Sequence, residues 1–327
     1  MRKSIAVLCT FAALLTHSYA AEYKIVPDWL KLPESRSALG NMHGDIAVSS
    51  KGDIYVSTMD PKAGVQVYAA DGKYIRTLPD APADFHGFVI HKDKDGEFLY
   101  GPRLSGQNIV KLTLEGKEVL NIPASAIPDQ YKVKPKGKDG KEGAPVVRLT
   151  GMDVAPNGDL YVTDGYSSDY VHVFDKTGKY LRSFGGKQAP YSFKTLHKIA
   201  IDTRFTPARI IACDRANMRV VHMSLDGEFL GVVATDLLLP AAITVQGDYA
   251  LVGELKGQVT VLDKAGKVVA KLGTNTNADQ VGKNAVEPAK WVTGTVTAPH
   301  GVAFDAKGNI YVAEYNITGR VHRFDKQ

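Results

Sequence analysis

The chain has 327 residues, of which 44% are hydrophobic and 23% charged, so its composition is that of an ordinary soluble globular protein. This length can bury a large core, either in one large domain or in two smaller ones. The formal net charge is +5, and 38 basic against 35 acidic residues remain once the two basic residues of the leader described below are set aside. So small an excess gives no support to a nucleic-acid-binding function.

The first 20 residues have the pattern of a secretory signal peptide. Arg2 and Lys3 precede an apolar run that ends in Ser18-Tyr19-Ala20, where small residues mark the cleavage site. We expect cleavage after Ala20, a mature chain of residues 21–327, and a periplasmic or secreted protein without a membrane span. A membrane anchor is the alternative, but it would need a longer apolar run.

Cysteine usage excludes an internal disulfide in the mature chain. Cys9 leaves with the leader, so Cys213 is the single mature cysteine. It lies in RIIACDR, a predicted strand, and we expect it to be a small buried residue.

Two kinds of β-rich segment alternate along the chain. One has two β runs around a glycine turn and begins with an apolar alternation, as in GMDVAPNGDLYVTD; the other is a second hairpin, as in VHVFDKTGKYLRSF. Period-2 alternation and D-G, E-G and N-G turns are typical of strands and hairpins. Each joined unit has about four strands in roughly forty residues, which is the pattern of a propeller blade. We expect one all-β domain, a six-bladed β-propeller with blades near residues 43–80, 85–123, 149–186, 193–234, 239–273 and 298–327.

Three segments fall outside the repeat. The sixth unit ends one strand short at VHRFDKQ, and we expect the β-like run in EYKIVPDWLKL, near the start of the mature chain, to supply the outer strand and close the ring. The Lys-, Gly- and Pro-rich segment 132–145 is expected to be a mobile, solvated loop, with a binding arm as the alternative. The segment 273–297, which contains Trp291, is long enough to cover a central site.

The blade pattern resembles that of NHL-repeat propellers. The segments VTDGYSSDYVHVFDKTGKYLRSFGG, LHKIAID and CDRANMRVV are similar in particular to the catalytic domain of peptidyl-α-hydroxyglycine α-amidating lyase, a six-bladed propeller. The resemblance covers most of the mature chain. It implies one transition-metal ion, zinc above all, held in the central channel by His86, His197 and His300. It also implies an active-site tyrosine at Tyr166 and an active-site arginine at Arg215.

Three positions depart from that family. A second arginine that the lyases require aligns with Thr58, and a methionine two residues before the third histidine aligns with Ala298. The acidic residue that follows the third histidine and helps to bind a structural calcium ion is Gly301 here. The resemblance thus implies a retained metal triad, but part of the lyase machinery and the family's calcium ligand are missing.

The repeat itself gives the three histidines a common place. Innermost strands direct their first residues toward the propeller axis, so His86, His197 and His300 from blades two, four and six would converge there, about 120° apart. Three neutral imidazoles with an open position are typical of a catalytic zinc site. The alternative is that histidine merely caps strands in this repeat. His43 in MHGDIAV is a candidate fourth ligand. A second repeat position, farther out in the blade, also carries histidine, and we expect these residues to be structural: His172, His222 and His322.

Tyr166 and Arg215 each allow two interpretations. A phenol near a metal ion could act as a general base, or Tyr166 could simply pack in its turn. Arg215 could bind a carboxylate of the substrate, or it could form an ion pair with Asp164 or Asp214.

These features favour a metal-dependent lyase that acts on a small-molecule or peptide substrate in the central channel. It would cleave a carbon–nitrogen bond to give an amide and a glyoxylate-type aldehyde. A non-catalytic propeller that binds a protein or glycan is the first alternative. A calcium-dependent lactonase-like propeller is the second, and it would line the channel with Glu, Asp and Asn rather than with histidine.

Overall fold

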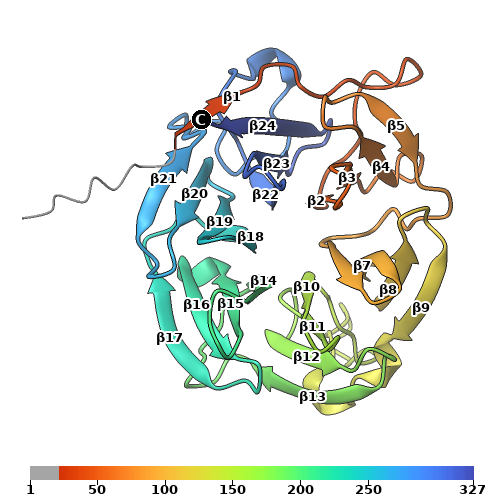
Figure 1. Ribbon diagram of the computed structural model, residues 1–327. Coiled ribbons are helices and arrows are strands. Elements are labelled where there is room, and N and C mark those ends of the chain that lie inside the picture. Colours follow the sequence, from red (N-terminus) through yellow and green to blue (C-terminus); the bar gives the residue numbers. More distant parts are fainter. Residues whose placement is uncertain (1–21) are drawn as a thin grey trace, which may run out of the picture.

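The computed structural model describes residues 22–327, so the predicted signal peptide lies outside the described residues. Six four-stranded antiparallel sheets surround a central axis (Figure 1). The chain is a six-bladed β-propeller, as the repeat predicts. The strands of each sheet fall within one of the predicted blade ranges, apart from the outer strand of the sixth blade.

In the first three blades the strands follow one another in chain order. Blade one contains β2 (Ile46–Val48), β3 (Ile54–Ser57), β4 (Val65–Tyr68) and β5 (Tyr74–Thr77). Blade two contains β6 (Val89–Asp93), β7 (Gly96–Arg103), β8 (Asn108–Thr113) and β9 (Glu118–Pro123). Blade three contains β10 (Gly151–Val154), β11 (Leu160–Thr163), β12 (Tyr170–Phe174) and β13 (Tyr180–Gly185).

Blades four and five repeat this order, and blade six modifies it. Blade four contains β14 (Leu196–Asp202), β15 (Arg209–Asp214), β16 (Arg219–Ser224) and β17 (Phe229–Ala234). Blade five contains β18 (Pro240–Gln246), β19 (Tyr249–Glu254), β20 (Gln258–Leu262) and β21 (Val268–Leu272). Blade six contains β22 (Pro299–Phe304), β23 (Ile310–Glu314), β24 (Arg320–Lys326) and the N-terminal β1 (Tyr23–Ile25).

The N-terminal strand closes the ring. β1 pairs antiparallel with β24, with Tyr23 opposite Lys326 and Ile25 opposite Phe324 (Figure 1). This confirms the predicted closure. The pairing is shorter than the predicted segment, because the chain leaves the sixth blade after residue 26 and crosses to the outer strand of the first, where Lys31 bridges to Lys73.

The core lies between neighbouring blades. Second strands such as β3, β11 and β23 are buried along their whole length, because each blade is covered on both faces. Tyrosines recur at one register position of these strands, and Tyr55, Tyr161 and Tyr311 are each no more than 1% exposed. The Tyr161 hydroxyl donates to the Leu225 carbonyl of the next blade, so this tyrosine also ties blades three and four together.

The connections between blades carry little regular structure. Four short 3-10 helices are present in the described part of the chain: η1 (Ala124–Ala126), η2 (Asp129–Tyr131), η3 (Arg215–Asn217) and η4 (Pro288–Lys290). The Lys-rich segment is exposed and forms a small ladder, with bridges between Val133 and Val146 and between Lys136 and Glu142. Within residues 22–327, no helix has the length and hydropathy that a membrane span requires.

Candidate metal centre

The three predicted ligands occupy one repeat position on alternate blades. His197 is the second residue of β14 and His300 the second residue of β22, and in both strands the register with the neighbouring strand shifts at the histidine. His86 precedes β6, next to the isolated bridge between Phe85 and Arg103. An extra residue in a strand leaves the ladder and re-aims its side chain, which here directs the imidazole toward the axis.

A backbone carbonyl of the following blade fixes each of these imidazoles. The distances from Nδ1 to the carbonyl oxygen are 2.7 Å for His86 and Thr150, 2.6 Å for His197 and Ala241, and 2.8 Å for His300 and Gly44. A carbonyl can only accept, so each Nδ1 carries the proton and each Nε2 presents a lone pair. Histidine-bearing and acceptor-bearing blades therefore alternate around the ring, and metal-binding histidines are commonly held in this way.

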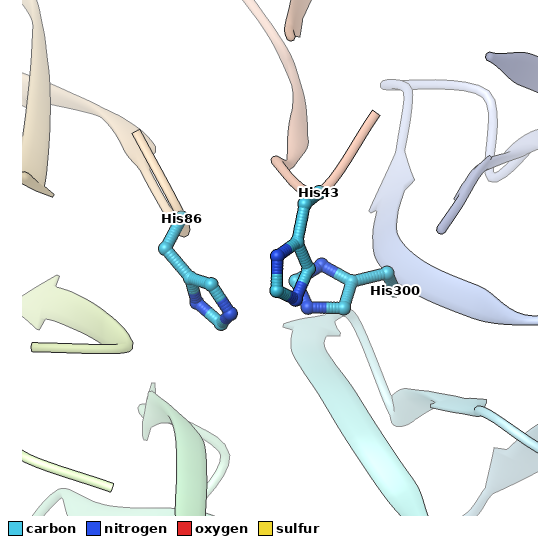
Figure 2. Close-up of side chains that lie close together, drawn as sticks. All are labelled: His43, His86 and His300. Atoms are coloured by element: carbon cyan, nitrogen blue, oxygen red, sulfur yellow. The ribbon is translucent and has the colours of Figure 1, made fainter. Parts of the chain in front are cut away.

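The four channel histidines gather in one cluster. The ring centroids of His86, His197 and His300 are 4.6 to 5.1 Å apart. The candidate ligand nitrogens of His43, His86 and His300 all lie within 4.8 Å of one another, and Figure 2 shows these three rings together. His43 directly precedes Gly44, which occupies the repeat position of the other three histidines, and this offset explains the irregular spacing of MHGDIAV.

The cluster has more lone pairs than protons to satisfy them. The Tyr166 hydroxyl lies 3.0 Å from His86 Nε2 and 3.1 Å from His197 Nε2, but it has one proton to donate. The Nη1 of Arg215 donates to the same hydroxyl at 3.3 Å. His300 Nε2 is buried and has no hydrogen-bond partner. Buried nitrogens with unused lone pairs are costly, so the donor set fits a bound cation.

Burial keeps these imidazoles neutral. It lowers the pKa values of His86, His197 and His300 well below the ordinary range, with smaller contributions from nearby positive charge. Burial and then the charge of Arg215 lower the pKa of His43 to about 4. Neutral imidazole is the form that binds metal ions, so the cluster is ready for a cation at neutral pH.

Tyr166 and Arg215 face the cluster together. Burial raises the pKa of the Tyr166 phenol, and the Arg215 guanidinium, whose carbon lies 5.2 Å from the ring centroid, opposes that rise. Within residues 22–327, Arg215 forms no ion pair, and Asp214 instead binds Arg219 at 2.7 Å. The guanidinium is therefore available to a substrate anion.

Sequence reasoning missed the role of four carboxylates that position the innermost strands of blades three to six. Each lies at the end of the second strand of its blade and accepts hydrogen bonds from backbone N–H groups of the segment leading into the innermost strand. The acceptors and donors are Asp164 with Arg148, Asp214 with Lys194, Glu254 with Leu238, and Glu314 with Thr297 and Ala298. An acidic residue thus ends or directly follows the second strand in each of blades three to six. A blade-by-blade alignment of the sequence could have revealed this repeat signal.

The outer histidines bind side chains of their own blades rather than the metal cluster. Burial alone would raise the pKa of Glu314, but His322, Arg320 and Thr297 outweigh it and hold the pKa at about 2. His172 is buried with its Nδ1 2.7 Å from Ser183, and His222 binds Asp202 at 3.0 Å. All three lie on third strands, away from the axial rings, which agrees with their expected structural role.

Tyr315 is a further aromatic residue at the centre that the sequence did not single out. It directly follows Glu314 at the end of β23, as Arg215 directly follows Asp214 at the end of β15, and its ring centroid lies 4.4 Å from that of His43 and 6.2 Å from that of His300. This position after the acidic residue of the second strand is the signal that could have found it.

The three departures from the lyase pattern are buried in the same region. The Thr58 hydroxyl donates to the Gly64 carbonyl at 3.2 Å, so it supplies no positive charge in place of the missing arginine. Ala298 is fully buried. At Gly301 any side chain would begin 2.6 Å from the Asp45 carboxylate, so this site has no room for the acidic residue of the family.

Comparisons with known proteins give the same fold and a distant lyase relative. A family model described as DUF5128, a 6-bladed β-propeller, matches residues 150–275. Peptidyl-alpha-hydroxyglycine alpha-amidating lyase 1 of Drosophila melanogaster is 26% identical over 256 residues. That match covers 65% of this chain but only 43% of the fly protein, so the chain spans less than half the length of this curated relative.

Solved structures resemble the chain at the level of the fold. A gluconolactonase from Xanthomonas campestris has a TM-score of 0.60 at 12% identity, with 89% of each chain covered. Virginiamycin B lyase from Staphylococcus aureus has a TM-score of 0.57 at 15% identity, with 93% of this chain and 99% of that chain covered. Identities this low establish the propeller architecture alone.

Proposed function

We propose that the protein is a metal-dependent propeller enzyme, a lyase that cleaves a carbon–nitrogen bond as amidating lyases do. The observation that carries the proposal is the convergence of three carbonyl-anchored imidazoles, His86, His197 and His300, on Tyr166 and Arg215. The distant similarity to an amidating lyase supports the same reaction class. Zinc suits this set best, because three neutral nitrogens with an open position are its usual catalytic environment.

The proposed substrate is an N-acyl α-hydroxyglycine or a close analogue. Arg215, which is half-buried and not engaged by a carboxylate among the described residues, binds the substrate carboxylate. A metal ion at the histidines supplies Lewis acidity toward a substrate oxygen. The hydroxyl O–H proton leaves as the C=O bond of the aldehyde forms. The C–N bond breaks, its electron pair goes to nitrogen, and nitrogen takes one proton, so amide and aldehyde balance the substrate atom for atom.

Tyr166 is the proposed proton carrier. Its hydroxyl lies within 3.1 Å of two histidine nitrogens and receives a hydrogen bond from Arg215, so it is within reach of any group bound between them. The raised pKa of Tyr166 disfavours the phenolate, whereas the Arg215 charge and a bound cation both favour it. The proposed location is the periplasm or the cell exterior, and it rests on the N-terminal sequence pattern.

The test combines metal content with turnover. Purified protein should contain about one equivalent of a tightly bound transition metal by elemental analysis, and it should release glyoxylate from a peptidyl-α-hydroxyglycine. His197→Ala should lose most of the metal and the turnover. His172→Ala is the matched control, because His172 is also buried but lies on β12 away from the cluster, and it should retain its metal.

Two outcomes would reject this function. Equal metal content in His197→Ala and the unmodified protein would remove the metal site from the axis. Full metal loading without glyoxylate release from any α-hydroxyglycine substrate would reject the lyase and favour a propeller that uses its metal-bearing face for binding.

A further inference from the structure

We propose that His43 is a fourth, displaceable ligand of the metal ion, which holds a coordination position until a substrate takes it. This inference rests on the metal site of the proposed function. It adds a residue whose role differs from that of the three anchored histidines.

His43 has the position of a ligand. Its candidate ligand nitrogen lies within 4.8 Å of those of His86 and His300, and its ring centroid is 4.7 Å from that of His86 and 4.8 Å from that of His300 (Figure 2). These separations are as short as those among the three histidines at the repeat position. His43 therefore forms a close set of candidate ligand nitrogens with two of the three anchored histidines, His86 and His300.

The backbone around His43 is fixed. Met42 and Asn316 exchange two backbone hydrogen bonds of 2.8 and 3.0 Å, and the Gly44 carbonyl accepts from His300 Nδ1 at 2.8 Å. The residue before His43 and the residue after it are thus both tied to blade six. The backbone position from which the His43 side chain projects is therefore fixed by the fold.

The imidazole ring of His43 is less constrained than the other three. Within residues 22–327, no hydrogen bond holds its Nδ1. The one hydrogen-bond partner of its Nε2 is the Tyr166 hydroxyl, at 3.4 Å. His43 is half-buried, whereas the other three histidines are at most 3% exposed. Its ring packs on Tyr315 at 4.4 Å, which offers an aromatic surface along which it can turn. A fixed backbone with an unanchored ring is what a ligand needs in order to leave and return.

The chemistry requires that departure. Four imidazoles saturate tetrahedral zinc, whereas catalytic zinc sites keep one position for water or substrate. His86, His197 and His300 cannot supply that position without breaking their carbonyl hydrogen bonds. His43 can leave at no such cost, so it is the ligand that a substrate oxygen or an added anion displaces.

The experiment uses the full mature chain with its native metal removed by a chelator and replaced by Co²⁺, whose visible spectrum reports coordination. Azide is the probe of an open position. The variants are His43→Ala and His43→Gln, the second of which preserves side-chain bulk beside Tyr315, with His300→Ala as the anchored-ligand comparison and His172→Ala as the control. Circular dichroism verifies the fold of each variant.

We expect both His43 variants to bind Co²⁺ about 10- to 100-fold more weakly than the unmodified protein, and His300→Ala more than about 1,000-fold more weakly. We expect the Co²⁺ spectrum of the His43 variants to change, and azide to half-saturate them at about one tenth of the concentration that the unmodified protein needs. His172→Ala should match the unmodified protein in both measurements.

Two results would overturn the inference while leaving the metal site in place. An unchanged spectrum and azide response in both His43 variants would show that His43 is no ligand. Loss of Co²⁺ as complete as in His300→Ala would show a fixed ligand. Absence of Co²⁺ binding by the unmodified protein would reject the metal site and this inference with it, whereas a His43-dependent spectrum without turnover would reject only the lyase reaction.

Discussion

The ammonium of Lys198 crosses the central channel and binds the carboxylate of Asp45. Lys198 belongs to β14 and Asp45 directly precedes β2, in blades that stand opposite each other in the six-bladed ring (Figure 1). Each side chain is no more than 6% exposed. By strand register both lie one residue beyond the position of the histidine ligands, and the other four blades place small residues in this layer: Gly87, Gly151, Ala242 and Gly301.

We predict that Lys198→Met destabilises the fold by about 3–5 kcal/mol, because it leaves a buried carboxylate without its partner. Asp45 keeps the backbone N–H groups of Ile46 and Phe88 as donors, which cannot compensate the charge. Adding Asp45→Asn should recover part of the loss, since the buried charge then disappears. Urea unfolding of Lys198→Met, Asp45→Asn and the double variant measures both effects. A double variant whose loss equals the sum of the two single losses would contradict this coupling.

The metal-free protein should lose stability as the pH falls below about 6.5. The folded-state pKa values of His43, His86, His197 and His300 are lowered, to about 4 for His43, while the unfolded chain takes up protons near 6.5. Between these values the unfolded state binds more protons, so stability is complete above pH 6.5 and declines by up to about 1.4 kcal/mol per pH unit for each such histidine.

The difference between two proteins isolates this effect. Burial raises the pKa values of Asp153 and Asp169, so these carboxyl groups lower the stability of each protein as the pH rises. Both proteins contain them, so their contribution cancels in the comparison. His86→Asn should therefore have a shallower dependence of unfolding free energy on pH than the unmodified chain, from pH 7 to 5, with both proteins treated with a chelator. Parallel curves would show that His86 does not stay neutral in the fold.

The N-terminal segment should contribute several kcal/mol to the free energy of unfolding of the propeller. Trp29 is 5% exposed, packs edge-on against Tyr311 at 5.2 Å, and donates from Nε1 to the Ala70 carbonyl at 3.0 Å. Trp29→Ala should cost about 3–5 kcal/mol. Deletion of residues 22–32 should cost more, because β24 would also become an open edge. Lys24→Ala, at an exposed position of β1, is the control and should melt like the intact chain in calorimetry.

Limited trypsin treatment should cut first within residues 134–143. The short ladder of this segment is held by few hydrogen bonds. Its four lysines are all exposed: Lys134, Lys136, Lys138 and Lys141. The nicked protein should keep its melting temperature, and replacement of these lysines by glutamine should abolish the early cut. First cleavage inside a blade of the unmodified protein would contradict the prediction.

Much of the fold could be predicted from the sequence because its signals are local. Alternating apolar residues and Gly-containing turns define strands such as β11 and β12 without reference to distant residues, and their recurrence gives six blades. A blade that lacks one strand requires another segment to cover its edge, which is why the pairing of Tyr23 with Lys326 was predictable across the length of the chain. His86, His197 and His300 share a repeat position, so their convergence follows from ring symmetry.

The tertiary structure alone decided the relationships that break this repeat. His43 precedes the shared position by one residue, so only the path of blade one shows that its ring reaches the same cluster. Tyr315 joins the site through ring closure, and Lys198 meets Asp45 because blades one and four are opposite. Sequence periodicity reports the environment of each residue within its own blade, whereas a contact across the channel depends on the strand bulges and on the closure of the whole ring.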